Sequence, residues 1–311
     1  MKVIYGVGNL KEKFHNVFLA IGVFDGLHIG HQKLIGKTVQ EAIKKKGVAL
    51  VMTFFPHPAH VLRPEKSLPY IISLAHRIQL IEKLGVAACI VVRFTKRFSK
   101  MTAPQFIRRY LVNKIGVKEI FVGDDFRFGH DRQGTIDIFQ QEAKRFGFKL
   151  NAVSTIKEGS SQKVGSSAVR EFISSGQLAK AKKCLGRHVS ILGKVVKGDG
   201  RGKKLGYRTA NLHLKNIVIP PIAVYAVLVN VDGKTYQGMA NIGRRPSFET
   251  SHETNLEVHI FQFHKNIYGR LIEVSFIEKI RDEKHFPSKE TLMAQLRTDA
   301  LTAKSVLSRI K

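Results

Sequence analysis

Two histidines and three glycines lie in one short segment, residues 22–31, with the sequence Gly-Val-Phe-Asp-Gly-Leu-His-Ile-Gly-His. An apolar run precedes the segment and an amphipathic run follows it, so it joins the end of a predicted strand to the start of a predicted helix. Glycines let a ligand approach the backbone closely, and N–H groups at a helix start favour phosphate. His28 and His31 are three residues apart, so both imidazoles can face that phosphate and stabilise charge developing on its phosphorus.

Taken alone, two histidines favour a metal pair or packing in a core. The glycines and the strand-to-helix setting shift the prediction to a phosphate site, with His28 and His31 as its catalytic residues. The other residues of this segment expected to bind the nucleotide are Gly22, Phe24, Asp25, Gly26 and Gly30.

Three later segments of the first half carry further polar and charged groups. Residues 53–58 read Thr-Phe-Phe-Pro-His-Pro, and residues 122–129 read Val-Gly-Asp-Asp-Phe-Arg-Phe-Gly. The first segment could merely leave a strand, and the second could be a surface turn. Ser166 and Ser167 can cap a helix, and Arg170 can bind phosphate oxygens through its planar fork of donors. Without this context the serine pair predicts only a helix cap.

The second half opens with closely spaced glycines in residues 193–202, whose backbone N–H groups can wrap a phosphate chain. Glycine turns are also common in β proteins, so this run alone is a weak signal. The glycines expected to bind the nucleotide are Gly198, Gly200 and Gly202. Downstream, Thr209 and Asn211 offer hydroxyl and amide oxygens that suit a hard cation, although a polar turn would use them equally well.

Glu257 is a carboxylate of the second half that is well placed for proton transfer. It alternates along a predicted strand with Leu256 and Val258, which face the opposite way. A carboxylate among apolar neighbours can accept a proton from a hydroxyl group. Considered alone, Glu257 would be better interpreted as an outward-facing strand residue.

Together and in this order, these segments resemble the motifs of bacterial bifunctional riboflavin kinase/FAD synthetases over nearly the whole chain. Residues 22–31 resemble the HxGH signature of the nucleotidyltransferase superfamily. The other matching segments are residues 53–58 (TFxPHP), 122–134 (VGxDFRFGxxRxG), 166–170 (SSxxR), 205–212 (a riboflavin kinase signature), 241–248 (NIGxRPTF), 255–260 (LEVH) and 281–286 (RDExxF).

The resemblance implies two ATP-dependent reactions: phosphorylation of riboflavin to FMN, then adenylylation of FMN to FAD with release of pyrophosphate. It implies that Glu257 is the kinase base and that Thr209 and Asn211 serve the magnesium–nucleotide site. The expected flavin-binding residues are His57, Asp124, Asp125, Phe126 and Arg127. Riboflavin, FMN and ATP are thus the expected small-molecule partners, Mg²⁺ the expected cofactor and FAD the final product.

Arg208 is the departure from the family pattern that matters most, because proline usually stands there before Thr209. Proline fixes its own φ and restricts the residue before it. Its loss predicts a looser turn, or else an added phosphate contact from Arg208. An alternative function is therefore FMN adenylylation alone, with a weakened kinase domain.

The elements needed to position these groups fall into two patterns. Apolar runs separated by helical spacing predict a parallel sheet covered on both faces. The resemblance identifies this part of the chain, residues 1–186, as a Rossmann-like α/β nucleotidyltransferase domain. The expected strands lie at residues 17–24, 48–55, 88–92 and 119–122, and the expected helices include residues 71–84 and 104–113. On an earlier helix, one face is expected to hold Leu34, Ile35, Val39, Ala42 and Ile43.

Strand-like runs with turn signals replace this pattern from Val189 onward. Asp232-Gly233 between two apolar runs is a hairpin signal. Residues 187–311 are therefore expected to form a small antiparallel β-barrel or sandwich, which the resemblance identifies as a riboflavin kinase barrel. A final helix is expected from about Ser288.

The composition bounds the partners. The formal net charge is +28, from 52 Lys and Arg against 24 Asp and Glu. Such an excess favours anionic partners and raises a hypothesis of another class, a basic nucleic-acid-binding protein. The sequence has no zinc-finger spacing and no RNP-like motif, so no specific nucleic acid is expected.

The two cysteines, Cys89 and Cys184, lie in apolar contexts that predict buried thiols and a reducing compartment. The start of the chain lacks the apolar core of a signal peptide, and the apolar run at residues 217–229 is too short to span a bilayer. We expect a cytoplasmic protein without a membrane partner. The sequence makes no prediction about the oligomeric state.

Overall fold

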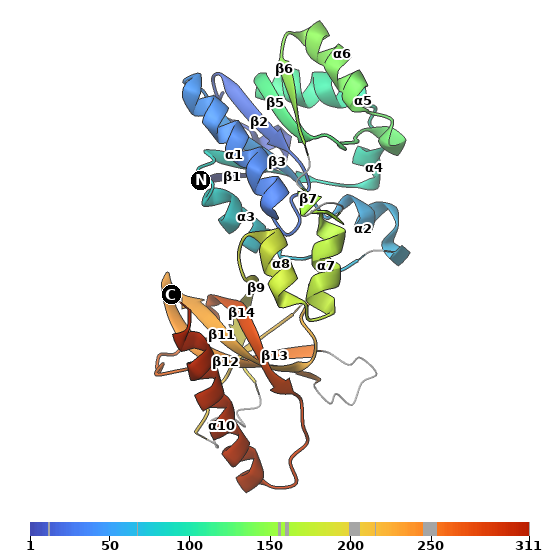
Figure 1. The fold of residues 1–311 in the computed structure, drawn as a ribbon. Helices are drawn as coiled ribbons and strands as arrows, with labels where there is room; N and C mark the ends of the chain where they lie inside the picture. The colour runs from blue at the N-terminus through green and yellow to red at the C-terminus, as the bar shows by residue number, and fades with distance from the viewer. Residues whose placement is uncertain are drawn as a thin grey trace. The chain divides into compact units, whose positions relative to one another are not determined.

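The computed structural model describes the chain except for residues 12, 67, 155–156, 159–161, 199–205, 215, 245–253 and 311. Its contacts divide it into two compact units (Figure 1). The first unit holds Met1–Pro69 with Leu74–Ser166, and the second holds Tyr70–Ser73 with Ser167–Lys311. The domain boundary between residues 186 and 187 stays a prediction, since it rests on sequence pattern rather than on contacts.

A six-stranded parallel sheet forms the centre of the first unit, with the strand order β1-β4-β3-β2-β5-β6. Its strands are β1 (Lys2–Tyr5), β2 (Val17–Ile21), β3 (Val48–Phe55), β4 (Ala88–Arg93), β5 (Val117–Gly123) and β6 (Lys149–Val153). The apolar run of β2 is buried along its whole length, as a strand covered on both faces requires. The predicted parallel sheet is confirmed.

The helices and minor elements of the first unit connect and cover these strands. They are η1 (Val7–Asn9), α1 (Ile29–Lys44), α2 (Pro58–Leu62), η2 (Pro64–Lys66), α3 (Leu74–Glu82), α4 (Lys96–Ser99), α5 (Ala103–Phe106), the π-helix η3 (Ile107–Ile115), η4 (His130–Arg132), α6 (Ile136–Phe146), β7 (Lys157–Glu158) and β8 (Gln162–Lys163). Helix α1 contacts β2, β3 and β5 and buries Leu34, Ile35 and Ala42. The expectation for Ile43 is wrong, because its side chain is 72% exposed.

The second unit is built around a closed barrel with the strand order β10-β13-β12-β11-β14-β9, and all of its strand pairs are antiparallel. Its elements are α7 (Ser166–Ser174), whose first residue belongs to the first unit, α8 (Leu178–Leu185), β9 (Val189–Val196), β10 (Ala210–Leu212), β11 (Ala223–Val231), β12 (Lys234–Arg244), β13 (Thr254–Ile260), β14 (Leu271–Asp282) and α10 (Lys289–Ser308). Leu256 and Val258 of β13 are fully buried, so the alternate residue Glu257 lies on the other face of its strand.

Local signals set the boundaries of these elements. The predicted hairpin is confirmed: Asp232 and Gly233 have φ values of 50° and 83°, and β11 pairs with β12 directly across them. Ser288 caps α10 through a capping box with Thr291. Within the described part of the chain, no helix is both long and apolar enough to cross a membrane.

Candidate active sites

A cavity of about 1100 Å³ opens at the carboxyl edge of the parallel sheet, within the first unit. Its lining includes Ile21 and Phe54 near the ends of β2 and β3, and Gly123 at the end of β5. Ligands of open α/β sheets bind at this edge. The cavity brings together predicted residues from four sequence motifs: Gly22, Phe24, His28, Gly30, His31, His57, Asp125, Phe126, Arg127 and Ser166.

The glycines of residues 22–31 make room for the segment's own aromatic rings. A Cβ atom at Gly22 would lie 2.7 Å from Cε1 of Phe24, and one at Gly30 would lie 3.2 Å from Cε1 and Nδ1 of His28. The turn between them has positive φ at Phe24 (54°), Gly26 (79°) and Leu27 (41°). Such strained conformations in residues other than glycine are concentrated at functional sites.

The two histidines form a stacked pair. Their ring centroids are 3.6 Å apart with an interplanar angle of 21°, and the ring of Phe24 meets His31 edge-on at 5.2 Å. Burial, followed by the charges of His28 and Arg77, holds the pKa of His31 well below 6.5, so His31 is neutral near pH 7. Its buried Nδ1 atom makes no hydrogen bond to the described residues. A buried polar atom without a partner at a cavity is suited to a ligand.

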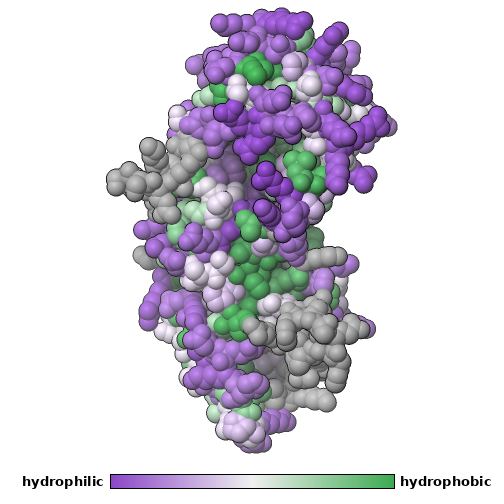
Figure 2. Space-filling view, turned by 90° about the vertical axis from the view of Figure 1, so that its right-hand side faces the viewer, coloured by the Kyte–Doolittle hydropathy of each residue, from purple (hydrophilic) through white to green (hydrophobic). Residues whose placement is uncertain are grey.

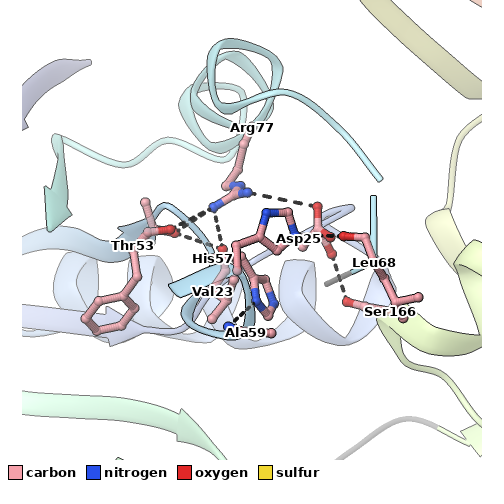
Figure 3. Close-up of polar contacts among 10 residues, drawn as sticks. Val23, Asp25, Thr53, His57, Ala59, Leu68, Arg77 and Ser166 are labelled. Atoms are coloured by element: carbon pink, nitrogen blue, oxygen red, sulfur yellow. Dashed lines mark hydrogen bonds and ion pairs between the residues drawn. The ribbon is translucent and has the colours of Figure 1, made fainter. Parts of the chain in front are cut away.

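Side chains from other elements hold the backbone of the turn (Figure 3). The Val23 carbonyl accepts hydrogen bonds from Thr53 Oγ1 and Arg77 Nη1, each at 2.8 Å. The Asp25 carbonyl accepts one from Ser166 Oγ at 3.0 Å. These bonds join β3, α3 and the start of α7 to the loop that carries the histidines.

Asp25 and Gly26 do not line the cavity. The Asp25 side chain is 1% exposed, and its Oδ1 lies 3.9 Å from Nη2 of the fully buried Arg77. The structure therefore places Asp25 beneath the turn, where it contacts a cation of the protein. Sequence reasoning missed Arg77, because it lies outside every recognised motif.

An aromatic wall lines another part of the same cavity, formed by Phe54, Phe94, Phe98, Phe106, Phe126 and Phe128. Ring centroids of neighbouring pairs in this wall are 5.5 to 6.3 Å apart. Only Phe126 was predicted, since the rings come from separate segments and no local spacing links them. Cationic side chains also line the cavity: Arg63, Lys96, Lys100, Arg127 and Arg132.

His57 caps helix α2 and thereby has a defined tautomer. Its Nδ1 accepts a hydrogen bond from the Ala59 N–H at 3.0 Å, so Nε2 carries the proton of the neutral ring. The ring can therefore offer one donor to a bound anion or carbonyl. In the other predicted flavin segment, Asp124 does not line the cavity and its N–H donates to the Val153 carbonyl at 3.2 Å.

The predicted kinase residues meet on three neighbouring strands of the barrel. Asn211 of β10 and Asn241 of β12 are both in register with Glu257 of β13. Asn255 joins two of these side chains, because its Nδ2 donates to Asn211 Oδ1 at 2.8 Å and to Glu257 Oε1 at 3.2 Å. Thr209 precedes β10 by one residue.

A cavity of about 200 Å³ lies here in the second unit, and its lining includes Asn211 and Asn255 but not Thr209 or Glu257. Gly198 packs on Asn211: a Cβ atom at Gly198 would lie 2.2 Å from Asn211 Nδ2. Gly200 and Gly202 lie outside the described residues. In the described ranges no group of three His, Cys, Asp or Glu side chains could hold a metal. The neutral oxygens of Thr209 and Asn211 nevertheless have the hardness that Mg²⁺ prefers.

The turn at Arg208 is tied to the barrel despite the missing proline. Nδ1 of His259 on β13 lies 2.8 Å from the Arg208 carbonyl, and the Tyr207 ring contacts His259 edge-on at 5.1 Å. Burial lowers the pKa of His259, so the ring is neutral near pH 7 and can donate through Nδ1.

Two family models match the parts of the chain that hold these two cavities. A model described as FAD synthetase matches residues 10–168, and one described as riboflavin kinase matches residues 185–307. The chain belongs to the bifunctional riboflavin kinase/FMN adenylyltransferase family. The members from Escherichia coli K12 and Haemophilus influenzae are both 36% identical to the chain, over 100% and 98% of its length and 99% of their own.

This bifunctional family includes a member from Buchnera aphidicola of Schizaphis graminum, which is 34% identical over the full length of both chains. A crystal structure from Streptococcus pneumoniae, described as a macrolide-efflux protein, matches with a TM-score of 0.83 and 30% identity, covering 98% of this chain and 99% of its own.

Of the predicted site residues, Ser167 and Arg170 follow Ser166 on α7, in the part of the chain that groups with the second unit.

Proposed function

We propose that the chain phosphorylates riboflavin to FMN in its second unit and adenylylates FMN to FAD in its first. The observation that supports this most is the cavity of the first unit. It gathers the histidine pair, which is predicted to bind ATP, with His57 and the loop residues Asp125 to Arg127, which are predicted to bind the flavin. Bifunctional relatives that match over the whole chain support both activities rather than adenylylation alone.

In the first unit, an FMN phosphate oxygen attacks the α-phosphorus of ATP. A bond from that oxygen to the phosphorus forms, the bond to the bridging oxygen of the β-phosphate breaks, and pyrophosphate leaves. The nucleophile is already an anion, so the step needs stabilisation of charge more than a base. His28 and His31 donate hydrogen bonds to the crowded phosphorus centre, and Ser166, which also lines the cavity, contacts the leaving phosphates.

The remainder of that cavity suits the flavin. The aromatic wall offers ring faces and edges to the isoalloxazine, and the cationic side chains offer charge to the FMN phosphate. His57 supplies its Nε2–H donor. We assign Asp124, Asp125, Phe126 and Arg127 to the same flavin site, with Asp124 acting through the backbone of the loop.

In the second unit, the 5′-hydroxyl oxygen of riboflavin attacks the γ-phosphorus of ATP while Glu257 accepts the hydroxyl proton. The bond between the γ-phosphorus and the β–γ bridging oxygen breaks, and ADP leaves. Asn255 orients the carboxylate by donating to Oε1. Thr209 and Asn211 would hold Mg²⁺, which when bound neutralises charge on the ATP phosphates. The glycines of residues 198–202 would hold the phosphate chain through their backbone.

The test is chromatography of flavins after incubation of the purified chain with ATP and MgCl₂, started separately from riboflavin and from FMN. We expect FMN and then FAD from riboflavin, FAD from FMN, and no product when the metal is chelated. FAD from FMN without FMN from riboflavin would restrict the chain to adenylylation. Absence of both products would refute the proposal.

We further propose that the chain works in the cytoplasm, because both of its cysteines are buried thiols, as in a reducing compartment. We expect no specific nucleic-acid binding. A gel-shift assay with random duplex should give only weak binding that is lost as salt increases. Tight binding that persists at high salt would contradict it.

A further inference from the structure

Arg77 of helix α3 is a buried cation that the reaction as described does not use. Its side chain is 0% exposed. Its Nη1 group donates to the carbonyls of Val23 at 2.8 Å and Phe54 at 3.3 Å, and to Thr53 Oγ1 at 3.3 Å. Burial of a guanidinium is costly, and an apolar side chain of similar volume would fill the same space without that cost. Packing alone therefore does not explain a cation here.

The groups that Arg77 contacts belong to the strained turn after β2. Val23 immediately precedes Phe24, which has a positive φ of 54°. A residue other than glycine keeps such a backbone conformation only where the surrounding structure holds it there. Two hydrogen bonds, from Arg77 and Thr53, hold the Val23 carbonyl in place. The Asp25 carboxylate lies 3.9 Å from the Arg77 guanidinium (Figure 3).

The turn leads directly into the catalytic pair. Leu27 follows with a φ of 41°, and its carbonyl accepts a hydrogen bond from Gln32 Nε2 at 2.9 Å. His28 is the N-cap of α1 and His31 lies in its first turn. A displacement of the turn would thus move both imidazoles together.

We propose that Arg77 is a positioning residue for adenylyl transfer, fixing the turn that presents His28 and His31 to the α-phosphorus. It acts by holding the Val23 carbonyl and by balancing the charge of Asp25. Arg77 does not line the cavity, so it acts through the turn and not on the substrate. The inference rests on the proposed function of the first unit.

The charge of Arg77 also acts on the imidazoles directly. It is the third cause of the lowered pKa of His31, after burial and the neighbouring His28. A variant that keeps the positive charge should therefore retain more activity than a neutral one of similar size.

The test compares Arg77→Met and Arg77→Lys with the wild type, measuring kcat and KM for FAD formation from FMN. Arg77→Met should lower kcat about 100-fold, as misplaced catalytic groups do, while KM for ATP and FMN changes less than about threefold. Arg77→Lys should recover about tenfold of that loss, since it keeps the charge and one donor. FMN formation from riboflavin in the same samples should stay at the wild-type rate.

Ile81→Ala is the matched control, because Ile81 is fully buried on the same helix and makes no polar contact with the turn. It should lower the unfolding temperature without lowering kcat. An Arg77→Met kcat within about threefold of the Ile81→Ala value would overturn the proposal, since positioning effects are larger.

Thr53→Val decides the matter if Arg77→Met does not fold, because it removes the other donor to the Val23 carbonyl and leaves Arg77 in place. It should lower kcat for FAD formation about tenfold. A wild-type kcat in both Thr53→Val and Arg77→Lys would overturn the proposal. A wild-type chain that makes no FAD from FMN would instead refute the proposed function, and this inference with it.

Discussion

At the scale of single residues, the structure explains why the histidine motif needs its glycines and its buried neighbours. Gly30 leaves room for the His28 ring, and His28 stacks on His31. Burial and two nearby cationic or ionisable groups keep His31 neutral. His31 can thus donate a hydrogen bond to phosphate without a permanent charge on its ring.

We predict that His31 stays neutral in the nucleotide-free protein as the pH falls below 6.5, because burial, His28 and Arg77 all lower its pKa. The measurement is an NMR titration of the histidine ring nitrogens, assigned with a His31→Gln variant. Arg77→Met should raise the midpoint of the His31 titration. A midpoint at or above 6.5 in the wild type would contradict the account.

We predict that Gly198→Ala weakens the kinase and spares adenylylation. The added methyl group would lie 2.2 Å from Asn211 Nδ2, so the amide that we propose as a Mg²⁺ ligand must move. The rate of FMN formation from riboflavin should fall about tenfold or more, as it does when metal-site ligands are disturbed. Gly36→Ala is the control, since a Cβ at Gly36 of α1 meets open space. Equal rates in the two variants would contradict the prediction.

At the scale of elements, the sequence could predict those strands and turns whose signals are local and strong. The central strands β2 and β3 are continuous apolar runs, and Gly176 and Gly186 follow α7 and α8 in the left-handed conformation that glycine favours at helix ends. The edge strands β1 and β6 could not be predicted in this way. They are short and partly exposed, so they lack a continuous apolar run.

The helix over residues 104–113 was predicted, but not its form: α5 is followed by the π-helix η3. The apolar face of α1 was predicted as far as Ala42. Ile43 lies one residue, or about 100°, further round the helix and faces solvent.

For the site, sequence motifs predicted the histidine pair and the flavin loop, because each is contiguous. The aromatic wall, Arg77 and the bridging role of Asn255 could not be predicted. Phe54, Phe94 and Phe106 meet only because separate elements end at one edge of the sheet. Arg77 contacts residues more than twenty positions away along the chain.

We predict that the attachment of α10 to the barrel depends on Asp299. This buried carboxylate accepts hydrogen bonds from Arg281 Nε and Nη2 on β14. Asp299→Ala should lower the free energy of unfolding by about 3 kcal/mol, because it leaves the largely covered Arg281 guanidinium without its counter-charge. The measurement is urea unfolding. The exposed pair of Asp232 and Arg270 is the control, and Asp232→Ala should cost about 1 kcal/mol or less. Similar losses in both variants would refute the prediction.

At the scale of the whole molecule, the net charge of +28 is the property that the two sites do not explain. Hydrophilic side chains cover much of the face drawn in Figure 2. Excess charge of one sign destabilises a compact state through self-repulsion, and salt screens it.

We therefore predict that the unfolding temperature rises as ionic strength increases from about 0.01 M to about 0.15 M, over which the Debye length falls from about 30 Å to about 8 Å. Differential scanning calorimetry would measure the unfolding temperature, in buffers without phosphate or other anions that could bind at the nucleotide sites. An unfolding temperature that stays constant or falls would show that the positive charges are already compensated within the folded chain.

The central claim is that the two reactions use separate sites, one with the histidine pair and one with Glu257. The most direct measurement follows both reactions in two variants, His31→Ala and Glu257→Gln, with folding checked by circular dichroism. The account predicts that His31→Ala loses FAD formation from FMN and keeps FMN formation from riboflavin, while Glu257→Gln does the reverse. Equal loss of both reactions in either folded variant would contradict it.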